Sequence, residues 1–282
     1  MKNPPHPDAS TETGLRGDRL TVRYDRNQPV VIDGQSIAIS SGKITALIGP
    51  NGSGKSTLLK TLARQLTPET GHVMLDEQDI AGISRLQFAR RVGMLFQENV
   101  APSGLTVEDL VYHGRYGHRR LFESFTDEDH TAVEKALRLA DIEHLRHRLV
   151  GRLSSGQKQL AWIAMALAQE TQYLFLDEPT TFLDLAHQFE VMDLIHKLNR
   201  ELGKTVVLIV HDLNLAARYA DVIFALRAGR IVASGSPHEV LNVETLRQVF
   251  DVEARILRDE AGQFLFCLPT GKARVSSSPE AK

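Results

Sequence analysis

Short runs of apolar and often β-branched residues alternate along the chain with longer segments in which apolar residues recur every three or four positions. The continuous runs predict buried strands, and the longer segments predict amphipathic helices. Buried strands separated by helices are typical of a largely parallel sheet that is covered on both faces. We therefore expect an α/β fold. The strand candidates are residues 20–24, 44–49, 92–96, 173–178, 205–212, 222–229 and 230–234.

The alternating pattern occupies residues 19–250, which we expect to form the main domain. Within it, residues 103–165 have weak strand signals and polar helical patterns, so they predict a helical subdomain inserted between two strands. Residues 251–272 predict a C-terminal extension with a short hairpin around Asp259–Gly262. Both ends are rich in Ser, Pro and charge and lack an apolar period, which predicts disordered tails. The expected tails are residues 1–18 and 273–282.

Composition and charge exclude several classes of protein. Lys and Arg number 33 against 35 Asp and Glu, a net charge of −2, so there is no overall positive field for coating nucleic acid. No apolar run approaches the roughly 20 residues of a membrane-spanning helix. The single cysteine, Cys267, cannot form an internal disulfide, and no charged and then apolar leader is visible. We therefore expect the protein to lie in the reducing cytosol.

The candidate strand 44–49 leads into a glycine-rich loop and then a helix, which satisfies the pattern G-x-x-x-x-G-K-[ST] in its required context. Glycines allow backbone amides to turn toward phosphate oxygens, and the helix start adds a positive field. Lys55 is expected to reach the β- and γ-phosphates of a nucleotide, and the Ser56 hydroxyl to bind Mg²⁺. The expected nucleotide contacts are Gly49, Pro50, Asn51, Gly52, Ser53, Gly54, Lys55, Ser56 and Thr57.

A second apolar strand ends in two adjacent acids, Asp177 and Glu178. Buried carboxylates are costly unless they are bound, and near a phosphate site Mg²⁺ and water would bind them. Neighbouring strand residues point to opposite sides, so the two acids should have different roles. We assign Asp177 to the metal and Glu178 to activation of the attacking water. These parts would suit a transporter ATPase, a DNA-repair ATPase or a kinase-like transferase.

The segment Leu153-Ser154-Ser155-Gly156-Gln157 resembles the L-S-G-G-Q signature of the ATP-binding cassette (ABC) family, and the order of motifs over residues 19–250 is similar to that family. The resemblance implies a P-loop ATPase fold with a helical insertion and an antiparallel β edge region. It also implies a homodimer in which the signature of one copy covers the ATP held by the other. Ser154, Gly156 and Gln157 would then contact nucleotide.

Further matches follow from that resemblance. Gln97 is placed like the glutamine that senses the γ-phosphate and the metal, and His211 like the histidine that contacts the γ-phosphate. Asp184 matches a loop that crosses the dimer interface. Tyr24 is placed like the aromatic residue that stacks on adenine, although a core strand aromatic is an alternative. His211 could alternatively be structural.

The chain departs from the family pattern at Ser155, where the signature has glycine, and at Lys158 and Leu160, where arginines are common. A side chain at Ser155 would crowd the phosphate if that residue needed a conformation open only to glycine. Because Ser154 and Gly156 remain, we expect the site to work, but with weaker dimer closure than in a Ser155→Gly variant.

Within the ABC family the chain most resembles the ATPase subunits of bacterial ferric-siderophore importers, with vitamin B12 and haem importers as alternatives. The resemblance implies ATP and Mg²⁺ as ligands, and two permease subunits and a substrate-binding protein as partners. It implies a peripheral location at the cytoplasmic face of the inner membrane and no nucleic-acid partner. A soluble ABC ATPase acting on DNA or ribosomes and a small-molecule kinase are the competing functions. Repair members have a long coiled coil that this chain lacks.

Overall fold

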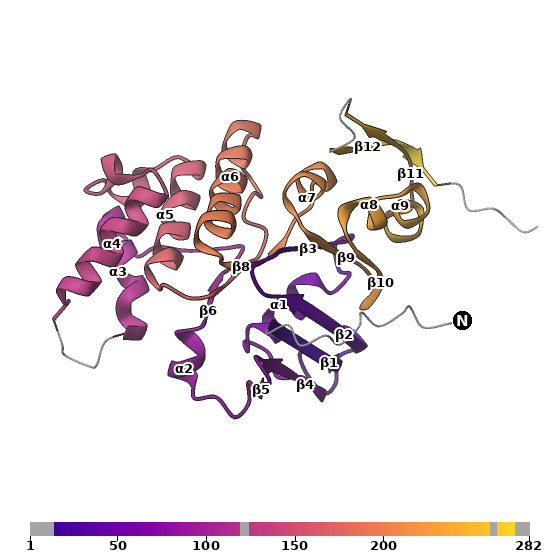
Figure 1. Cartoon of the computed structure of the whole chain (residues 1–282), viewed down its shortest axis with the longest axis horizontal. Coiled ribbons are helices and arrows are strands. Elements are labelled where there is room, and N and C mark those ends of the chain that lie inside the picture. The colour runs from indigo at the N-terminus through magenta and orange to yellow at the C-terminus, as the bar shows by residue number, and fades with distance from the viewer. Residues whose placement is uncertain (1–13, 119–123, 260–263, 274–282) are drawn as a thin grey trace, which may run out of the picture.

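The computed structural model describes residues 14–118, 124–259 and 264–273. Its central sheet is built from six strands, which are β3 (Ile44–Ile48), β6 (Val92–Leu95), β7 (Tyr173–Leu176), β8 (Thr205–Ile209), β9 (Val222–Arg227) and β10 (Arg230–Gly235). The order across the sheet is β10-β9-β3-β8-β7-β6 (Figure 1). All neighbours are parallel except β10, which pairs antiparallel with β9. The expected α/β fold is confirmed.

The continuous apolar runs of β7 and β8 arise because both faces of these strands are covered. Leu174 and Leu176 of β7 belong to the hydrophobic cluster on one side of the sheet, whereas Tyr173 and Phe175 belong to the cluster on the other. All four side chains are at most 1% exposed. Successive residues of a strand point to opposite faces of the sheet. A strand that alternated between apolar and polar residues would therefore place its polar side chains on one face, and that face would lie in water.

A second sheet is antiparallel and lies beside helix α1 (Lys55–Leu62) (Figure 1). Its strands are β1 (Gly14–Val22), β2 (Ile32–Ser40), β4 (Thr70–Leu75) and β5 (Gln78–Asp79), in the order β2-β1-β4-β5. Helix α2 (Arg85–Ala89) connects this sheet to β6. The apolar inner side chains of the sheet pack with α1 and with one face of the central sheet.

The expected N-terminal tail, residues 1–18, is wrong for its last five residues. β1 begins at Gly14, and its first residues pair with both β2 and β4. Leu15 is 1% exposed within the core, so burial and two sets of ladder hydrogen bonds offset the entropy of ordering this segment. Residues 1–13 lie outside the described residues.

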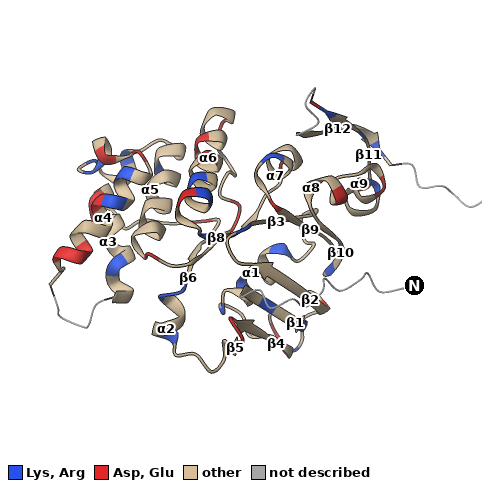
Figure 2. Cartoon of the chain, viewed as in Figure 1, with Lys and Arg blue, Asp and Glu red and all other residues tan. Residues whose placement is uncertain are grey.

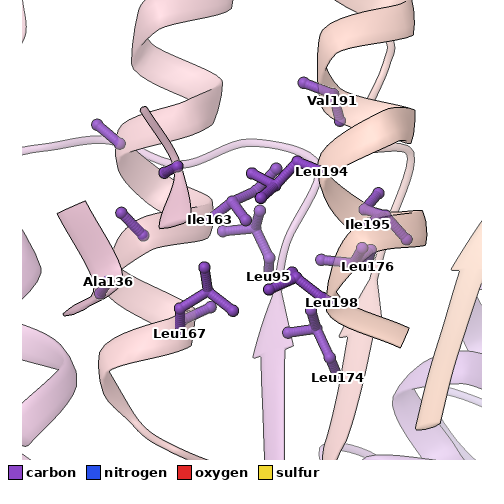
Figure 3. Packing of buried hydrophobic residues seen from close by; sticks show 14 of the residues in the cluster. Leu95, Ala136, Ile163, Leu167, Leu174, Leu176, Val191, Leu194, Ile195 and Leu198 are labelled. Atoms are coloured by element: carbon purple, nitrogen blue, oxygen red, sulfur yellow. The ribbon is translucent and has the colours of Figure 1, made fainter. Parts of the chain in front are cut away.

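The described residues between β6 and β7 form helices and 3₁₀ turns. They are α3 (Val107–His113), η1 (Gly114–His118), α4 (Asp127–Leu139), η2 (Glu143–Leu145), η3 (Val150–Arg152) and α5 (Ser155–Ala168). Helix α6 (Leu185–Leu202) follows β7 and lies beside α5 (Figure 1). Figure 3 shows Ile163 and Leu167 of α5 pointing toward Leu194 and Leu198 of α6, with Leu95 between them. These helices therefore share one hydrophobic core with the sheet.

The last part of the chain contains α7 (Leu213–Tyr219), α8 (Pro237–Val240), α9 (Val243–Phe250), β11 (Val252–Arg258) and β12 (Leu265–Lys272). β11 and β12 pair antiparallel, as the expected hairpin requires, and the turn around Asp259–Gly262 lies largely outside the described residues. Of the expected C-terminal tail, Ala273 is described and its amide donates to Asp251 O at 2.7 Å. Residues 274–282 lie outside the described part. None of the described helices combines the length and apolar character needed to cross a bilayer.

Candidate active site

The glycine-rich loop follows β3 and turns sharply before α1. Gly49, Gly52 and Gly54 have φ values of 148°, 75° and 99°, which favour glycine. A Cβ on Gly49 would lie 2.2 Å from Leu226 O, so the loop also passes too close to β9 for any side chain. The start of α1 at Lys55 directs free backbone amides toward the space above the loop. The geometry matches the phosphate-binding loop expected from the sequence.

The Lys55 ammonium lies against the inside of this loop. Its Nζ donates to Gly49 O at 2.9 Å and to Pro50 O at 3.0 Å, and burial lowers the pKa of Lys55, an effect that Glu178 and Asp177 oppose. Ser53 Oγ is buried in the same loop without a hydrogen-bond partner. An unpartnered buried hydroxyl is costly, so the loop is suited to an acceptor-rich ligand such as phosphate.

The two acids after β7 have different environments, as the strand geometry predicted. Asp177 is 4% exposed, and its Oδ1 accepts from Ser56 Oγ at 3.0 Å. Burial raises the pKa of Asp177, because removal from water disfavours the charged form. Asp177 and Ser56 together therefore offer two adjacent oxygen ligands to a hard cation.

Glu178 faces the space above the loop and is held by three side chains from three segments. Its Oε1 lies 2.6 Å from His211 Nε2, and its Oε2 accepts from Gln97 Nε2 at 2.7 Å and from Thr181 Oγ1 at 3.0 Å. Gln97, Glu178 and His211 follow β6, β7 and β8, which are adjacent in the sheet. The carboxyl ends of parallel strands thus bring these side chains together.

Glu178 itself has a φ of 55°, in the left-handed region. Non-glycine residues adopt this conformation rarely, and it occurs often at functional sites. Here it turns the chain sharply after β7, and the Thr181 amide bonds back to Glu178 O at 3.3 Å. The turn brings Thr181 under the carboxylate, a contact that the sequence pattern did not reveal.

A pocket of 760 Å³ lies between the loop and Glu178. Its lining contains most of the residues expected to bind nucleotide, together with Val31, Thr181 and Phe182, which sequence reasoning missed. Phe182 also has a positive φ, 64°, and is 86% exposed. The expected residues in the lining are Tyr24, Asn51, Gly52, Ser53, Gly54, Lys55, Ser56, Thr57, Gln97, Glu178 and His211.

Tyr24 lies at the edge of this pocket rather than in a core. It is 53% exposed, and its hydroxyl is 3.0 Å from Thr57 Oγ1. The alternative of a buried strand aromatic therefore does not hold. The half-exposed Tyr24 side chain lines the pocket, where an aromatic ring can stack on a planar ligand.

The signature residues and Asp184 lie outside this pocket. The described lining does not contain Ser154, Gly156, Gln157 or Asp184. Ser154 begins α5 through a capping box with Gln157, and Asp184 begins α6 by accepting from the His187 amide at 3.0 Å. These segments present exposed helix starts away from the loop of their own chain.

Ser155 does not need a glycine-only conformation. It is the first residue of α5, and its φ is not among the positive values found in the described residues. The condition behind the expected weakening of dimer closure is therefore not met, because an L residue fits the first helical turn without backbone strain.

Comparison with known proteins decides the family. A profile described as ABC transporter matches residues 32–181, more than half of the chain. The chain belongs to the ABC transporter family. The loop, the acids after β7 and the signature segment are accordingly parts of one ABC cassette, and the chain is an ATP-binding ATPase.

Curated relatives of this ABC protein include the ferric enterobactin transport ATP-binding protein of Escherichia coli, which is 44% identical over 94% of this chain and 97% of that protein. The iron(3+)-hydroxamate import ATP-binding protein of Bacillus subtilis is 44% identical over 90% of this chain and 94% of that protein. A solved chain of a metal-chelate type ABC transporter in an inward-facing conformation has a TM-score of 0.79 at 28% identity, covering 91% of this chain and 96% of its own. The ABC cassette fold is therefore confirmed along nearly the whole chain.

A bacterial ABC transporter cassette solved as a dimer has a TM-score of 0.69 at 26% identity, covering 79% of this chain and 98% of that chain. ABC cassettes thus pair with a second copy. This agrees with the separation of the signature residues from the pocket of their own chain.

Proposed function

We propose that this ABC ATPase drives import of iron(III)-siderophore complexes through a bacterial inner membrane, from its cytoplasmic face. The cargo is supported by the likeness to curated relatives whose names include ferric enterobactin and iron(3+)-hydroxamate, at 44% identity. The ATPase role rests on one observation above all, the Glu178 carboxylate held over the phosphate-binding loop by Gln97, Thr181 and His211.

ATP fits the pocket by its chemistry. Loop amides, the start of α1 and the unpartnered Ser53 hydroxyl would hold phosphate oxygens, and Tyr24 would stack on the base. Lys55 would exchange its two loop carbonyls for the β- and γ-phosphates, because an ammonium is attracted more strongly to charged oxygens than to neutral ones. Gly49 and Pro50, which supply these carbonyls, are not in the described pocket lining.

The oxygen ligands near Lys55 fit Mg²⁺. Ser56 and Asp177 already lie within hydrogen-bond distance, and the burial that raises the Asp177 pKa would be offset by a cation. Gln97 would be the third protein ligand of Mg²⁺, and phosphate and water would be the other ligands. When bound, Mg²⁺ supplies neutralisation of the phosphate charge.

Hydrolysis follows from the position of Glu178. The carboxylate accepts a proton from a water molecule while the water oxygen forms a bond to the γ-phosphorus. The bond from that phosphorus to the bridging oxygen breaks, so ADP and phosphate leave. His211 and Gln97 would detect the γ-phosphate because both already contact Glu178.

The second half of each site would come from a partner copy. Ser154, Gly156, Gln157 and Asp184 lie outside the pocket of their own chain, which supports a head-to-tail dimer with two shared ATP sites. Two permease subunits would span the membrane, and a substrate-binding protein would deliver the chelate. Closure on ATP and release after hydrolysis would drive the permeases.

A deletion strain of the source bacterium tests the cargo. Uptake of radioactive iron(III)-siderophore should fall to background and return with the wild-type gene but not with a Glu178→Gln gene. Vitamin B12 and haem uptake measured in parallel separate the alternative cargoes. Loss of B12 or haem uptake with normal siderophore uptake would overturn the proposed cargo but leave the ATPase role intact.

A further inference from the structure

The start of α5 and the start of α6 meet at a contact that the ATPase chemistry does not use. Gly156 is buried in the first turn of α5, and a Cβ built on it would lie 2.0 Å from Cδ2 and 2.5 Å from Cγ of His187. The φ of Gly156 is not in the left-handed region, so its backbone would accept any residue. Glycine is needed here because the imidazole of His187 occupies the space of a side chain.

The ring of His187 is held on its other side by Asp184. One oxygen, Asp184 Oδ1, accepts from the His187 amide at 3.0 Å and from Nδ1 at 2.7 Å. The side-chain bond from Asp184 raises the pKa of His187, and the bonds from His187 lower the pKa of Asp184. Both pKa shifts favour a pair of charged groups. The ring is therefore held by two hydrogen bonds to one carboxylate oxygen, one from the His187 amide and one from its side chain.

His187 thus joins two segments that are distant in sequence. Asp184 belongs to the loop before α6, Gly156 belongs to the signature, and the imidazole lies between them. The two helices also share the hydrophobic core seen in Figure 3, and Leu153 and Leu183, just before the two helix starts, pack in the same core. Beyond this apolar packing, the His187 ring connects Gly156 of the signature directly to Asp184.

We propose that His187 is a positioning residue that holds the signature segment and the Asp184 loop in one arrangement, so that both meet the partner copy's ATP together. The inference rests on the proposed function, because it concerns the same shared site. A surface that is already ordered loses less entropy when it associates. Without the imidazole, the two segments would have to be aligned during dimer closure.

The first test measures ATP-dependent dimer formation in a Glu178→Gln background, by sedimentation across a range of ATP concentrations. His187→Ala should raise the ATP concentration for half-maximal dimer about 10-fold, a size typical of coupling between residues in contact. Binding of fluorescent ATP to the monomer should not change, because His187 is outside the pocket lining. Lys197→Ala, at an exposed position of the same helix, is the matched control.

Steady-state ATPase assays with wild-type Glu178 give a second measure. His187→Ala should raise the apparent KM for ATP and leave kcat at saturating ATP within about twofold, because the catalytic groups are untouched. A fall in kcat alone, or an ATP dependence equal to that of the control, would overturn the proposal. Thermal unfolding of each variant establishes that it is folded.

A double-mutant cycle tests the contact itself. Gly156→Ala should weaken dimer formation strongly when His187 is present, because the new methyl group and the ring compete for one space. In the His187→Ala background the same change should cost much less. An equal fold-loss in both backgrounds would overturn the proposal. If Gly156→Ala prevents folding only when His187 is present, the contact is supported, and His187→Ala alone still tests the function.

The two proposals fail in different ways. If the Glu178→Gln protein forms no dimer on ATP, the shared-site function is wrong. If that dimer forms normally and the His187 variants match Lys197→Ala, only the role of His187 is wrong.

Discussion

At the scale of single residues, several independent constraints act on the Glu178 side chain. Its left-handed φ, its contact with His211 and its two accepted hydrogen bonds all fix one carboxylate orientation. Backbone strain of this kind costs about 1–3 kcal/mol and persists only where surrounding contacts enforce it. A fixed carboxylate orientation is what the proposed activation of water by Glu178 requires.

Replacing Glu178 with Gln preserves the shape and removes the proton acceptor. We expect ATP hydrolysis to fall by about 100-fold or more, because general-base catalysis contributes at least that much. Binding of ATP should remain, since the loop and Lys55 are unchanged. Phosphate release measures the rate, and gel filtration with ATP measures accumulated dimer. Glu201→Gln, at an exposed position, is the control, and normal turnover of Glu178→Gln would refute the assignment.

At the scale of elements, the strands of the central sheet could be predicted from the sequence and those of the antiparallel sheet mostly could not. β8 is apolar at successive positions because both its faces are covered. β2 alternates irregularly between buried and exposed residues, and its pairing with β1 shifts register twice, so no clear period of two survives. The N-terminal extension of β1 alternates in burial, but one of its two buried positions is Gly17, so Leu15 alone gives an apolar signal there.

The site was predictable where a motif ends a strand. Asp177, Glu178 and His211 follow apolar runs closely, and Lys55 follows one through the glycine-rich loop. Parallel strands bring their carboxyl ends together. Thr181 was not predictable, because its contact depends on the left-handed turn at Glu178, which no sequence pattern marks. Contacts between segments, such as the ring of His187 over Gly156, were missed as well, since spacing along the chain carries no information on them.

Helix α4 and turn η1 are joined by a buried ion pair. Arg115 Nε donates to Asp129 Oδ1 at 2.8 Å, with the two side chains 1% and 4% exposed. Figure 2 shows acidic residues where α4 begins. Burial disfavours ionisation of Asp129, but hydrogen bonds from Thr126 and Arg115 outweigh it and lower the pKa from 3.8 to about 2. The ionised carboxylate therefore stabilises the folded state by about 2 kcal/mol, at about 1.4 kcal/mol per pKa unit.

This pair makes the stability of the helical region depend on pH. The contribution of Asp129 is present above pH 3.8 and is lost as pH falls from 3.8 toward about 2. Asp129→Asn should therefore lower the free energy of unfolding at pH 6, and the difference from wild type should shrink by about 1 kcal/mol at pH 3. Urea unfolding at both pH values measures it. Asp127→Asn, at an exposed position two residues earlier in the same helical turn, is the control, and a difference independent of pH would contradict the prediction.

The C-terminal hairpin places Cys267 on its inner face, where the residue is 4% exposed. Burial, with a smaller effect of Asp212, raises the thiol pKa from 9.0 to about 11. The thiolate fraction at pH 8 should then be about 100-fold lower than for a free thiol, and alkylation correspondingly slow. Iodoacetamide labelling followed by mass spectrometry, with and without urea, measures the ratio. Equal labelling rates in both would show that the hairpin does not cover the thiol.

At the scale of the whole molecule, the pocket and the signature residues lie in different parts of one chain, so a complete site would need two copies. We expect Lys55→Ala and Ser154→Arg proteins each to be nearly inactive. The first lacks the ammonium group of the loop, and the second lacks the serine that caps the start of α5. Mixed in equal amounts, they should regain activity. Random pairing gives half heterodimers with one intact site each, which is about a quarter of the wild-type sites.

The size of this recovery separates the possible assemblies. A chain that hydrolysed ATP alone would show no recovery on mixing, because Lys55→Ala would keep its defect and Ser154→Arg, whose change lies outside the pocket, would already be active by itself. A dimer whose two sites must hydrolyse ATP together would also recover almost nothing, but its variants would still form mixed dimers, which are detected by purifying one variant through an affinity tag and measuring how much of the other is retained. Recovery near a quarter of wild-type turnover would therefore indicate a head-to-tail dimer with independent sites. Phosphate release from titrated mixtures should peak at equal amounts, because that ratio gives the largest number of heterodimers.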